Sequence, residues 1–453
     1  MSNDSDFDRR VSALEAMGFA PYPSVRNLTN LLDNGGIVGR VINLAPGRLH
    51  LAFPARMNLR EYSVKADLDA VLAELRPGDI VVATAQNDVI VEIIPCVIVR
   101  QTLEPADPQP GVARLCEREQ ELFWNEVTRK TFTDADRVMT FLRSFLSERG
   151  YLEVVMPVLT SNPDISPNLP FQTQASDGTV LSLRTTYPYS ERLLYSLTKI
   201  YQIGPNFRDE PSGIERSPEF NMLSIGQAMV DYEEMIELGE SLVRELTQYV
   251  KGSTKVDFFG ESVDFAVPWI RLSTAEAIYR YAGINIDDCF EIDKLESIVQ
   301  SKKLPLPETP FGAIRGQIYH GAVFDILLKN FVYPKLRQPT FLTEFPYFFG
   351  GPGRAVDMGQ RFKMRAEGFV AGIEIAETAS VLTDPRQIRR WHGDVLAEKH
   401  RVGWMQEENH SYLDTIDRGL LIPSVIAFGI ERLLMLVLEK AHISEVMWYS
   451  HRV

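Results

Sequence analysis

Residues 207–220 read FRDEPSGIERSPEF, and the fold can be inferred by working outward from this stretch. Alternate side chains of an extended strand share a face, so Arg208 and Glu210 are expected to point into one cleft. There Arg208 can bind a phosphate, and Glu210 can accept a hydrogen bond from an adenine amino group. Arg216, beyond a turn, can take a second phosphate, while Phe220 offers a ring on which a base can stack. The spacing predicts a site for a bent triphosphate.

Taken alone, a stretch such as residues 207–210 is more often a solvated strand edge than a nucleotide site. Two further stretches, however, support the nucleotide site. Upstream, residues 149–158 read RGYLEVVMPV, and downstream, residues 428–432 read FGIER. In this order the three stretches resemble motifs 1, 2 and 3 of the class II aminoacyl-tRNA synthetases, and the resemblance covers residues 115–453. It implies an α+β fold with an antiparallel sheet flanked by helices, a homodimer assembled through motif 1, and Arg432 as a last arginine for ATP.

The amino-terminal part shows short apolar runs broken by turns, with a helical spacing over residues 66–75. The runs are residues 36–42, 49–53, 79–83 and 89–94. This pattern predicts a small five-stranded, OB-like β-barrel. Its position resembles the anticodon-binding barrel of the lysyl, aspartyl and asparaginyl (class IIb) subgroup, and the whole is most like a divergent lysyl-tRNA synthetase paralogue. Because the proline-rich segment 104–111 marks a boundary, we expect the barrel over residues 1–110 and the catalytic domain over residues 111–453.

Composition limits the possible partners of the protein. The 453 residues carry a net charge of −14, which argues against a general nucleic-acid binder, because such proteins neutralise phosphates. Residues 1–110 hold 10 Lys and Arg against 14 Asp and Glu. Arg40 and Phe53 can still contact a looped-out RNA base, but a barrel that has lost RNA binding fits as well. A tRNA partner therefore stays open.

The sequence shows no pattern typical of a membrane span, a secretory signal or a set of paired cysteines. No apolar run approaches the roughly 20 residues of a membrane span, and the acidic amino terminus does not resemble a secretory signal. Cys96, Cys116 and Cys289 are widely spaced and odd in number, unlike a zinc site or a disulfide framework. We expect inert thiols in a cytoplasmic protein with no membrane partner.

A pair of glutamates occurs in residues 367–375, EGFVAGIEI. In the class IIb subgroup two acidic residues seven apart on such a hairpin bind the magnesium that bridges the ATP phosphates, and Glu367 and Glu374 have this spacing. The resemblance thus implies ATP and Mg²⁺ as cofactors, and a substrate carboxylate that attacks the α-phosphorus to give an acyl-adenylate and pyrophosphate. It assigns Arg208 to the α-phosphate, and Arg216 with Arg432 to the β- and γ-phosphates.

The substrate pocket departs from the lysyl pattern. Where the family places carboxylates around the substrate ε-ammonium, this chain has Ser224 and Val381, and Gly226 replaces a tyrosine. A buried ammonium without an anionic partner costs several kcal/mol, so lysine is a poor candidate. Where the lysyl pattern has an asparagine that contacts the substrate carboxylate, this chain has Glu377. Motif 3 is altered too, because Ala427 stands where a glycine is expected.

Aromatic residues are expected to dominate what remains of the pocket. The family's glutamate for the α-amino group falls near Pro188, between Tyr187 and Tyr189. A second aromatic run occupies residues 345–349. These side chains either pack in the core or line a pocket for a small or apolar acid, with Glu377 meeting an amine.

Three functions remain compatible with the sequence. The first is a tRNA-independent ligase that activates an amino acid or related small carboxylic acid and passes it to an acceptor amine or carrier. The second is a genuine aminoacyl-tRNA synthetase of altered, non-lysine specificity. The third is a non-catalytic homologue that binds a ligand. The acidic barrel and the rebuilt pocket favour the first.

Overall fold

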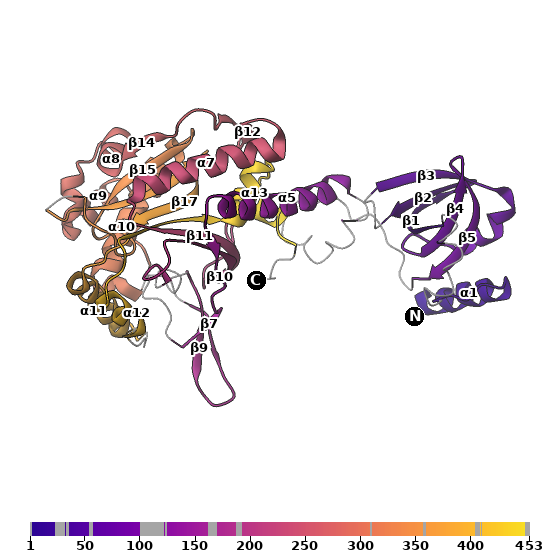
Figure 1. The fold of residues 1–453 in the computed structure, drawn as a ribbon, viewed down its shortest axis with the longest axis horizontal. Coiled ribbons are helices and arrows are strands. Elements are labelled where there is room, and N and C mark those ends of the chain that lie inside the picture. Colours follow the sequence, from indigo (N-terminus) through magenta and orange to yellow (C-terminus); the bar gives the residue numbers. More distant parts are fainter. Residues whose placement is uncertain are drawn as a thin grey trace. The chain divides into compact units, whose positions relative to one another are not determined.

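In the computed structural model, the chain divides into two compact units, Met1–Phe132 and Thr133–Val453 (Figure 1). The residues that the structure describes are 2–22, 32, 36–53, 58–99, 122, 125–161, 170–186, 193–308, 310–356, 359–403, 408 and 410–448. The predicted domain boundary at residue 110 lies outside the described residues and stays a prediction.

The amino-terminal unit is built around a closed barrel whose strands pair in the order β1-β2-β3-β5-β4. Its elements are α1 (Ser2–Ala16), β1 (Ile37–Ala45), β2 (Arg48–Phe53), β3 (Asn58–Val64), η2 (Ala66–Leu68), α3 (Asp69–Glu74), β4 (Ile80–Gln86) and β5 (Val89–Val97). Alternation along the strands directs Leu49, Leu51, Val81 and Ile90 inward, where they are fully buried. The prediction of a small five-stranded barrel is confirmed.

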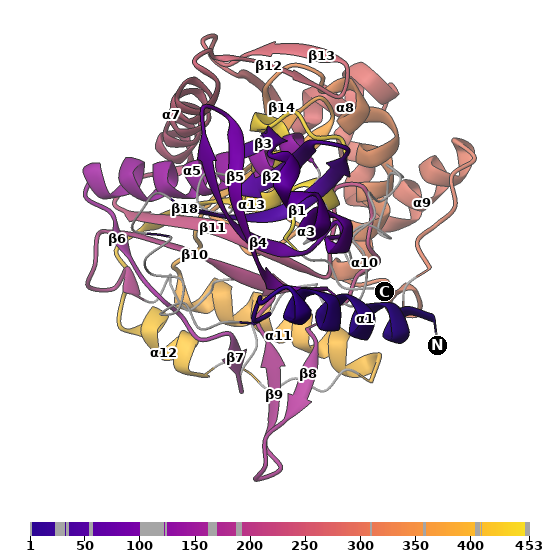
Figure 2. The same cartoon turned by 90° about the vertical axis from the view of Figure 1, so that its right-hand side faces the viewer.

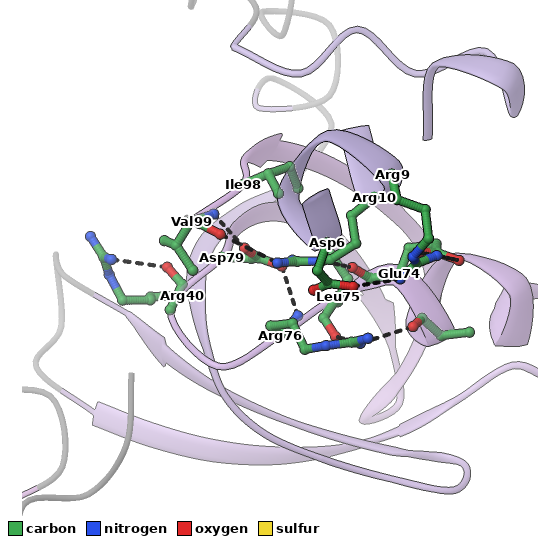
Figure 3. Close-up of polar contacts among 12 residues, drawn as sticks. Asp6, Arg9, Arg10, Arg40, Glu74, Leu75, Arg76, Asp79, Ile98 and Val99 are labelled. Atoms are coloured by element: carbon green, nitrogen blue, oxygen red, sulfur yellow. Dashed lines mark hydrogen bonds and ion pairs between the residues drawn. The ribbon is translucent and has the colours of Figure 1, made fainter. Parts of the chain in front are cut away.

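Helix α1 is held on the barrel by a buried ion pair between Arg10 and Asp79. Arg10 also donates hydrogen bonds to the carbonyl oxygens of Glu74 and Val99, at 2.7 and 3.3 Å. Asp79 accepts two more, each 2.7 Å long, from the backbone N–H groups of Arg76 and Val99. Figure 3 shows these contacts around Arg10 and Asp79. Because both charges are paired and hydrogen-bonded, the cost of burying them is offset, and the cluster acts as a structural joint.

The second unit contains an eight-stranded sheet with the order β14-β15-β16-β17-β18-β11-β10-β6. The strands are β6 (Leu152–Glu153), β10 (Lys199–Phe207), β11 (Glu219–Ala228), β14 (Ile270–Ser273), β15 (Thr340–Pro346), β16 (Phe362–Val370), β17 (Ile373–Ser380) and β18 (Pro423–Gly429). Pairing is antiparallel from β15 to β10, whereas the edge strands β14 and β6 run parallel to their neighbours. This is the predicted α+β fold with a large antiparallel sheet.

Helices on one face of this sheet form the main core. They are α5 (Glu126–Glu148), α7 (Tyr232–Lys251) and α13 (Ile430–Val437). The side chain of Asp231 caps the first turn of α7, and Gly252 ends the helix in the left-handed conformation, with φ of 71°. Gly239 lets α7 approach the sheet closely, because a Cβ there would come within 2.7 Å of Ile426 Cδ1. The core therefore sits between α7 and the central strands.

A second core lies beneath β15, and the remaining elements surround the sheet. Its helices are α8 (Thr274–Ala282), α9 (Ile292–Ser301) and α10 (Gln317–Leu327). The other elements are α11 (Pro385–Arg401), α12 (His410–Asp417), β7 (Leu159–Thr160), β8 (Gln172–Gln174), β9 (Val180–Leu183), β12 (Lys255–Phe258) and β13 (Glu261–Asp264). In both ribbon views α11 and α12 lie on the side of the sheet opposite α7, and the β8–β9 hairpin projects from the unit (Figures 1 and 2).

Two expectations about the whole chain can be compared with the described residues. Cys96 and Cys289 are buried free thiols, and Cys116 lies outside the described residues. Within the described ranges, no helix has both the length and the apolar character that crossing a membrane requires.

Candidate active site

A cavity of about 890 Å³ lies in the second unit, and a smaller pocket of about 340 Å³ shares part of its wall. The shared wall consists of charged residues from the loop after β10, from β17, from the first turn of α13, from the end of α10 and from the segment directly after α10. They are Arg208, Glu215, Arg216, Asp325, Lys329, Glu374, Glu377 and Arg432. The three arginines predicted to bind phosphates therefore meet where the two spaces join.

The loop between β10 and β11 positions two of these arginines. Strand β10 ends at Phe207, and the backbone N–H of Arg208 donates to the carbonyl of Pro218 at 2.9 Å, which closes the loop. Arg208 and Glu210 thus lie in the loop. The prediction that both residues belong to one extended strand is wrong. Both still line the smaller pocket, together with Arg216.

Phe220 lies in the smaller pocket beside Arg208, whose guanidinium carbon is 5.2 Å from the ring centroid. The next residue, Asn221, donates its backbone N–H and its side-chain amide to the carboxylate of Glu431, at 3.0 and 2.9 Å. Burial raises the pKa of Glu431 above its ordinary value. Glu431 therefore ties α13 to β11 next to the ring on which a base is expected to stack. Glu431 is not among the site residues predicted from the sequence.

Arg432 connects α13 to β17 and to the loop after β10. Its Nη1 donates to the carbonyl oxygen of Glu374 at 2.8 Å and lies 3.3 Å from the Glu374 carboxylate. Its Nε donates to the carbonyl of Glu215 at 3.1 Å. The side chain keeps 20% of its surface exposed. The guanidinium is thus held in place while part of it stays accessible to a ligand.

A second arginine, Arg365 on β16, lies between two carboxylates in the larger cavity. Its Nη2 is 2.8 Å from Glu367 and its Nη1 is 2.6 Å from Glu377. Burial raises the pKa of Glu367 above its ordinary value, although Arg365 opposes this shift. Glu377 is much more open, because 43% of its side chain is exposed. The carboxylate of Glu377 therefore faces the cavity already paired with a cation.

The predicted magnesium ligands, Glu367 and Glu374, both line the larger cavity from adjacent strands. Among the described residues there is no group of three or more side chains that could hold a metal ion. Two carboxylates are hard oxygen donors, which suit magnesium when a nucleotide supplies further oxygens. The pair therefore fits a metal that arrives with ATP and does not form an all-protein metal site.

Proteins of one known family resemble this chain over most of its length. The family "tRNA synthetases class II (D, K and N)" matches residues 113–453. The chain belongs to this class II synthetase family. A lysine–tRNA ligase of Pseudomonas syringae is 30% identical over 402 residues, which are 84% of this chain and 79% of that protein. Lysine–tRNA ligases of Clostridium perfringens and Chloroflexus aurantiacus are 28% and 31% identical over 343 and 341 residues, each 74% of this chain and 67% of the relative.

Membership of the class II family makes the protein an ATP-dependent, synthetase-like ligase. The residues predicted for the substrate pocket of this synthetase are only partly brought together. Glu377 and Val381 line the larger cavity. Ser224 and Gly226 lie on β11 and are not among the described lining residues. A Cβ at Gly226 would lie 2.9 Å from Leu194 Cδ1, so Leu194 covers that position.

The aromatic residues are divided between core and cavity. Tyr187 and Tyr189 lie outside the described residues. Phe348 and Phe349 line the larger cavity, whereas Phe345 is fully buried in the core. The aromatic run at residues 345–349 therefore contributes side chains both to the core and to the cavity wall.

Arg365, which lines the larger cavity, is not among the residues predicted from the sequence. The loop at Gly350 packs on its guanidinium, because a Cβ at that glycine would lie 2.9 Å from Arg365 Cζ. The signal that was present is the alternation of Lys363, Arg365 and Glu367 on one face of a strand whose other residues are mostly apolar. Charges that share a buried face need partners, and this pattern predicts a polar interior site.

Proposed function

We propose that this cavity activates an amino acid or a related small carboxylic acid with ATP, and that the acyl group then passes to an amine or a carrier without tRNA. A carboxylate oxygen of the substrate attacks the α-phosphorus of ATP, and pyrophosphate leaves. The acceptor then attacks the acyl carbon of the adenylate, and AMP leaves. The family uses ATP and Mg²⁺, so the first step fits the class of enzyme.

The observation that carries the proposal is the meeting of Arg208, Arg216 and Arg432 where the two spaces join. In this assignment Arg208 binds the α-phosphate, and Arg216 and Arg432 hold the β- and γ-phosphates. Glu210 accepts from the adenine amino group, and Phe220 stacks on the base. These groups orient the triphosphate so that the substrate carboxylate approaches in line.

Magnesium, when bound, neutralises charge on the phosphate oxygens. Glu367 and Glu374 would hold it, and Arg365 fixes the orientation of Glu367 through their 2.8 Å ion pair. Glu377 accepts a hydrogen bond from a substrate amine. Since Arg365 already balances its charge, Glu377 needs only to position that amine.

Transfer without tRNA is supported by the rebuilt lysine pocket and by the charge of residues 1–110, which carry more acidic than basic residues. Val381 lines the cavity where the resemblance places a carboxylate. The chain is further proposed to form a homodimer through motif 1, because Leu152 and Val155 leave 54% and 92% of their surfaces exposed. We also propose a catalytic domain over residues 111–453.

A second candidate, an aminoacyl-tRNA synthetase of altered specificity, is favoured by one comparison. The match to the lysine–tRNA ligase of P. syringae covers 84% of the chain, more than residues 113–453 alone, so it extends into the amino-terminal unit. Retention of a barrel alongside the catalytic fold is expected of an enzyme that binds tRNA.

The test is a pyrophosphate-exchange screen with ATP, Mg²⁺ and a panel of amino acids, β-amino acids and simple carboxylic acids. We expect exchange with at least one acid. Arg208→Ala should abolish it, since a charge-assisted contact worth roughly 1.5 to 3 kcal/mol is lost along with the orientation of the α-phosphate. Arg280→Ala removes an exposed ion pair with Glu276 on α8 and is the matched control.

Exchange that persists in Arg208→Ala would show that the site is wrongly assigned. An assay of total tRNA with each activated acid then separates the two candidates. Robust charging of any tRNA would end the tRNA-independent proposal and establish the second candidate.

A further inference from the structure

Two charged residues at the carboxyl end of α10 have no role in the site as assigned so far. Helix α10 passes directly into a π-helical turn, η6 (Leu328–Val332), and Asp325 and Lys329 lie four residues apart across this junction. Both residues line the larger cavity and also the smaller pocket. They therefore lie in the same shared wall as the arginines assigned to the phosphates.

One face of α10 and of the turns after it lines the larger cavity. Its lining residues recur every three or four positions, which is the spacing of one helix face. They include Ile318, Gly321, Ala322, Asp325, Lys329 and Tyr333. Of these six, Asp325 and Lys329 are the ones that also line the smaller pocket. The charged part of this face thus borders the predicted phosphate site, and the part before Asp325 is uncharged.

Tyr333, the first residue of η7 (Tyr333–Lys335), connects Asp325 to a predicted magnesium ligand. Its hydroxyl donates to Asp325 Oδ1 at 3.2 Å and lies 3.5 Å from Glu367 Oε2. Burial, followed by the charges of Glu367 and Asp325, raises the pKa of Tyr333 well above its ordinary value, so the hydroxyl keeps its proton. Lys329 Nζ in turn lies 2.5 Å from Asp325 Oδ2. A chain of contacts therefore runs from the ammonium to the carboxylate of Glu367.

Lys329 keeps the freedom to bind a ligand. Its side chain is 50% exposed, whereas that of Asp325 is 24% exposed. An ion pair between partly exposed side chains four residues apart is weak, so little is lost when the ammonium leaves Asp325 for another anion. An ammonium on a flexible four-carbon stem is a good phosphate ligand, because it carries three donors and a full charge.

The charge balance of the shared wall gives this lysine a further importance. Four of the eight residues that line both spaces are basic and four are acidic. Without Lys329 the count would be three against four, and a net negative wall would oppose the binding of a polyphosphate. The four basic residues are Arg208, Arg216, Lys329 and Arg432.

We propose that Lys329 is a fourth phosphate-binding residue, which leaves Asp325 when ATP binds and contacts the β- and γ-phosphates that depart as pyrophosphate. The inference rests on the proposed function, because it takes the shared wall to hold the triphosphate of ATP. Arg208, Glu210 and Phe220 are assigned to the α-phosphate and the base. Lys329 therefore discriminates ATP and pyrophosphate from AMP, which lacks both outer phosphates.

The experiment measures binding of three ligands to the whole protein by calorimetry, in the presence of Mg²⁺. The ligands are ATP, pyrophosphate and AMP, so no chemical step is needed. Lys329→Met keeps most of the length of the side chain but loses the ammonium. We expect the dissociation constants of ATP and pyrophosphate to rise by about 10- to 150-fold, as for loss of a hydrogen bond to a charged group, and that of AMP to change by less than about twofold. Lys329→Arg keeps the charge and should recover most of the affinity for ATP.

Two further variants make the result specific. Lys294→Met is the matched control, because Lys294 also forms an ion pair on a helix, with Glu291, and is 52% exposed, but is absent from the described lining. It should leave all three dissociation constants unchanged. The double variant Lys329→Met with Asp325→Asn removes one charge of each sign, so the net charge of the wall equals that of the parent. The loss of affinity for ATP and pyrophosphate should persist in it.

The outcomes separate this inference from the proposed function. Weaker binding of ATP and pyrophosphate with AMP unaffected supports the inference even when no acid gives pyrophosphate exchange, and in that case the proposed adenylation alone fails. Exchange by a Lys329→Met variant that binds ATP as tightly as the parent would leave the proposed function standing and overturn the inference. An equal loss for all three ligands, or full recovery in the double variant, would also overturn it. Failure of the parent to bind either ATP or pyrophosphate would overturn both proposals.

Discussion

The two units of this chain bury arginine–carboxylate clusters in opposite ways. In the barrel, Asp79 is completely buried and accepts from Arg10 and from two backbone N–H groups, and neither residue lines a cavity described here. In the second unit, Arg365 lies between Glu367 and Glu377, and Glu377 is 43% exposed and lines the larger cavity. The first cluster is closed and holds a helix on a barrel, whereas the second is left open in a space large enough for a substrate.

The difference teaches that burial of an ion pair does not by itself indicate function. What distinguishes the two clusters is whether a charged group of the cluster stays exposed to a cavity. A wholly buried cluster stabilises one conformation, whereas a carboxylate that faces a cavity can still bind a ligand. The following variants test this distinction.

The largest effect is expected for Asp79→Ala in the closed cluster. The change leaves the Arg10 guanidinium and the N–H groups of Arg76 and Val99 buried without their acceptor. Breaking a buried pair in this way should lower the free energy of unfolding of the barrel by about 3 to 5 kcal/mol. Denaturant unfolding of the full chain checks this, and kcat for pyrophosphate exchange should stay near that of the parent protein. A loss of exchange with no loss of stability would reverse the assignment of the two clusters.

An intermediate effect is expected for Arg365→Met in the open cluster. Activation should fall by about 10- to 150-fold, because the charge-assisted bonds that orient Glu367 and Glu377 are lost. The free energy of unfolding should fall by no more than about 2 kcal/mol, since the buried Glu367 can bind a proton and Glu377 is open to solvent. Measuring kcat/KM and the free energy of unfolding on one preparation of Arg365→Met separates a loss of activation from a loss of stability. A variant that unfolds as readily as Asp79→Ala would show that Arg365 is structural.

The smallest effect is expected for Glu377→Gln. The amide keeps the shape and one acceptor oxygen, so KM for the acid should rise by about two- to tenfold while KM for ATP stays constant. Stability should change by less than about 0.5 kcal/mol, because much of the side chain is exposed. Equal increases in both KM values would place Glu377 at the nucleotide and not at the substrate amine.

The sequence predicted the architecture better than the interior of the site. Alternating apolar runs located four barrel strands, but not β3, whose sequence NLREYSV carries two charges and no clear alternation. The motifs located Arg208, Arg216 and Arg432, although Arg208 lies in the loop after β10 and not in the strand. Strand periodicity gives the face of a side chain, but loop closure is set by backbone hydrogen bonds that no spacing reveals.

The substrate end could not be inferred because it depends on contacts between distant segments. Alignment with the motifs selected Ser224 and Gly226, yet Leu194 covers the glycine. Trp391 and His392 follow an ordinary amphipathic helix pattern, and only the fold shows that they line the cavity. Which side chains a strand or helix meets is decided by packing, and packing is not encoded in local spacing.

The central claim is that three arginines and two glutamates hold one folded triphosphate with its magnesium. Calorimetric titration of the full chain with ATP, in the presence of Mg²⁺ and then of excess EDTA, tests it most directly. We expect one ATP bound per chain, weaker binding without Mg²⁺, and binding that is lost in Arg432→Ala. An identical binding isotherm in all three conditions, or no heat of binding at all, would contradict the account.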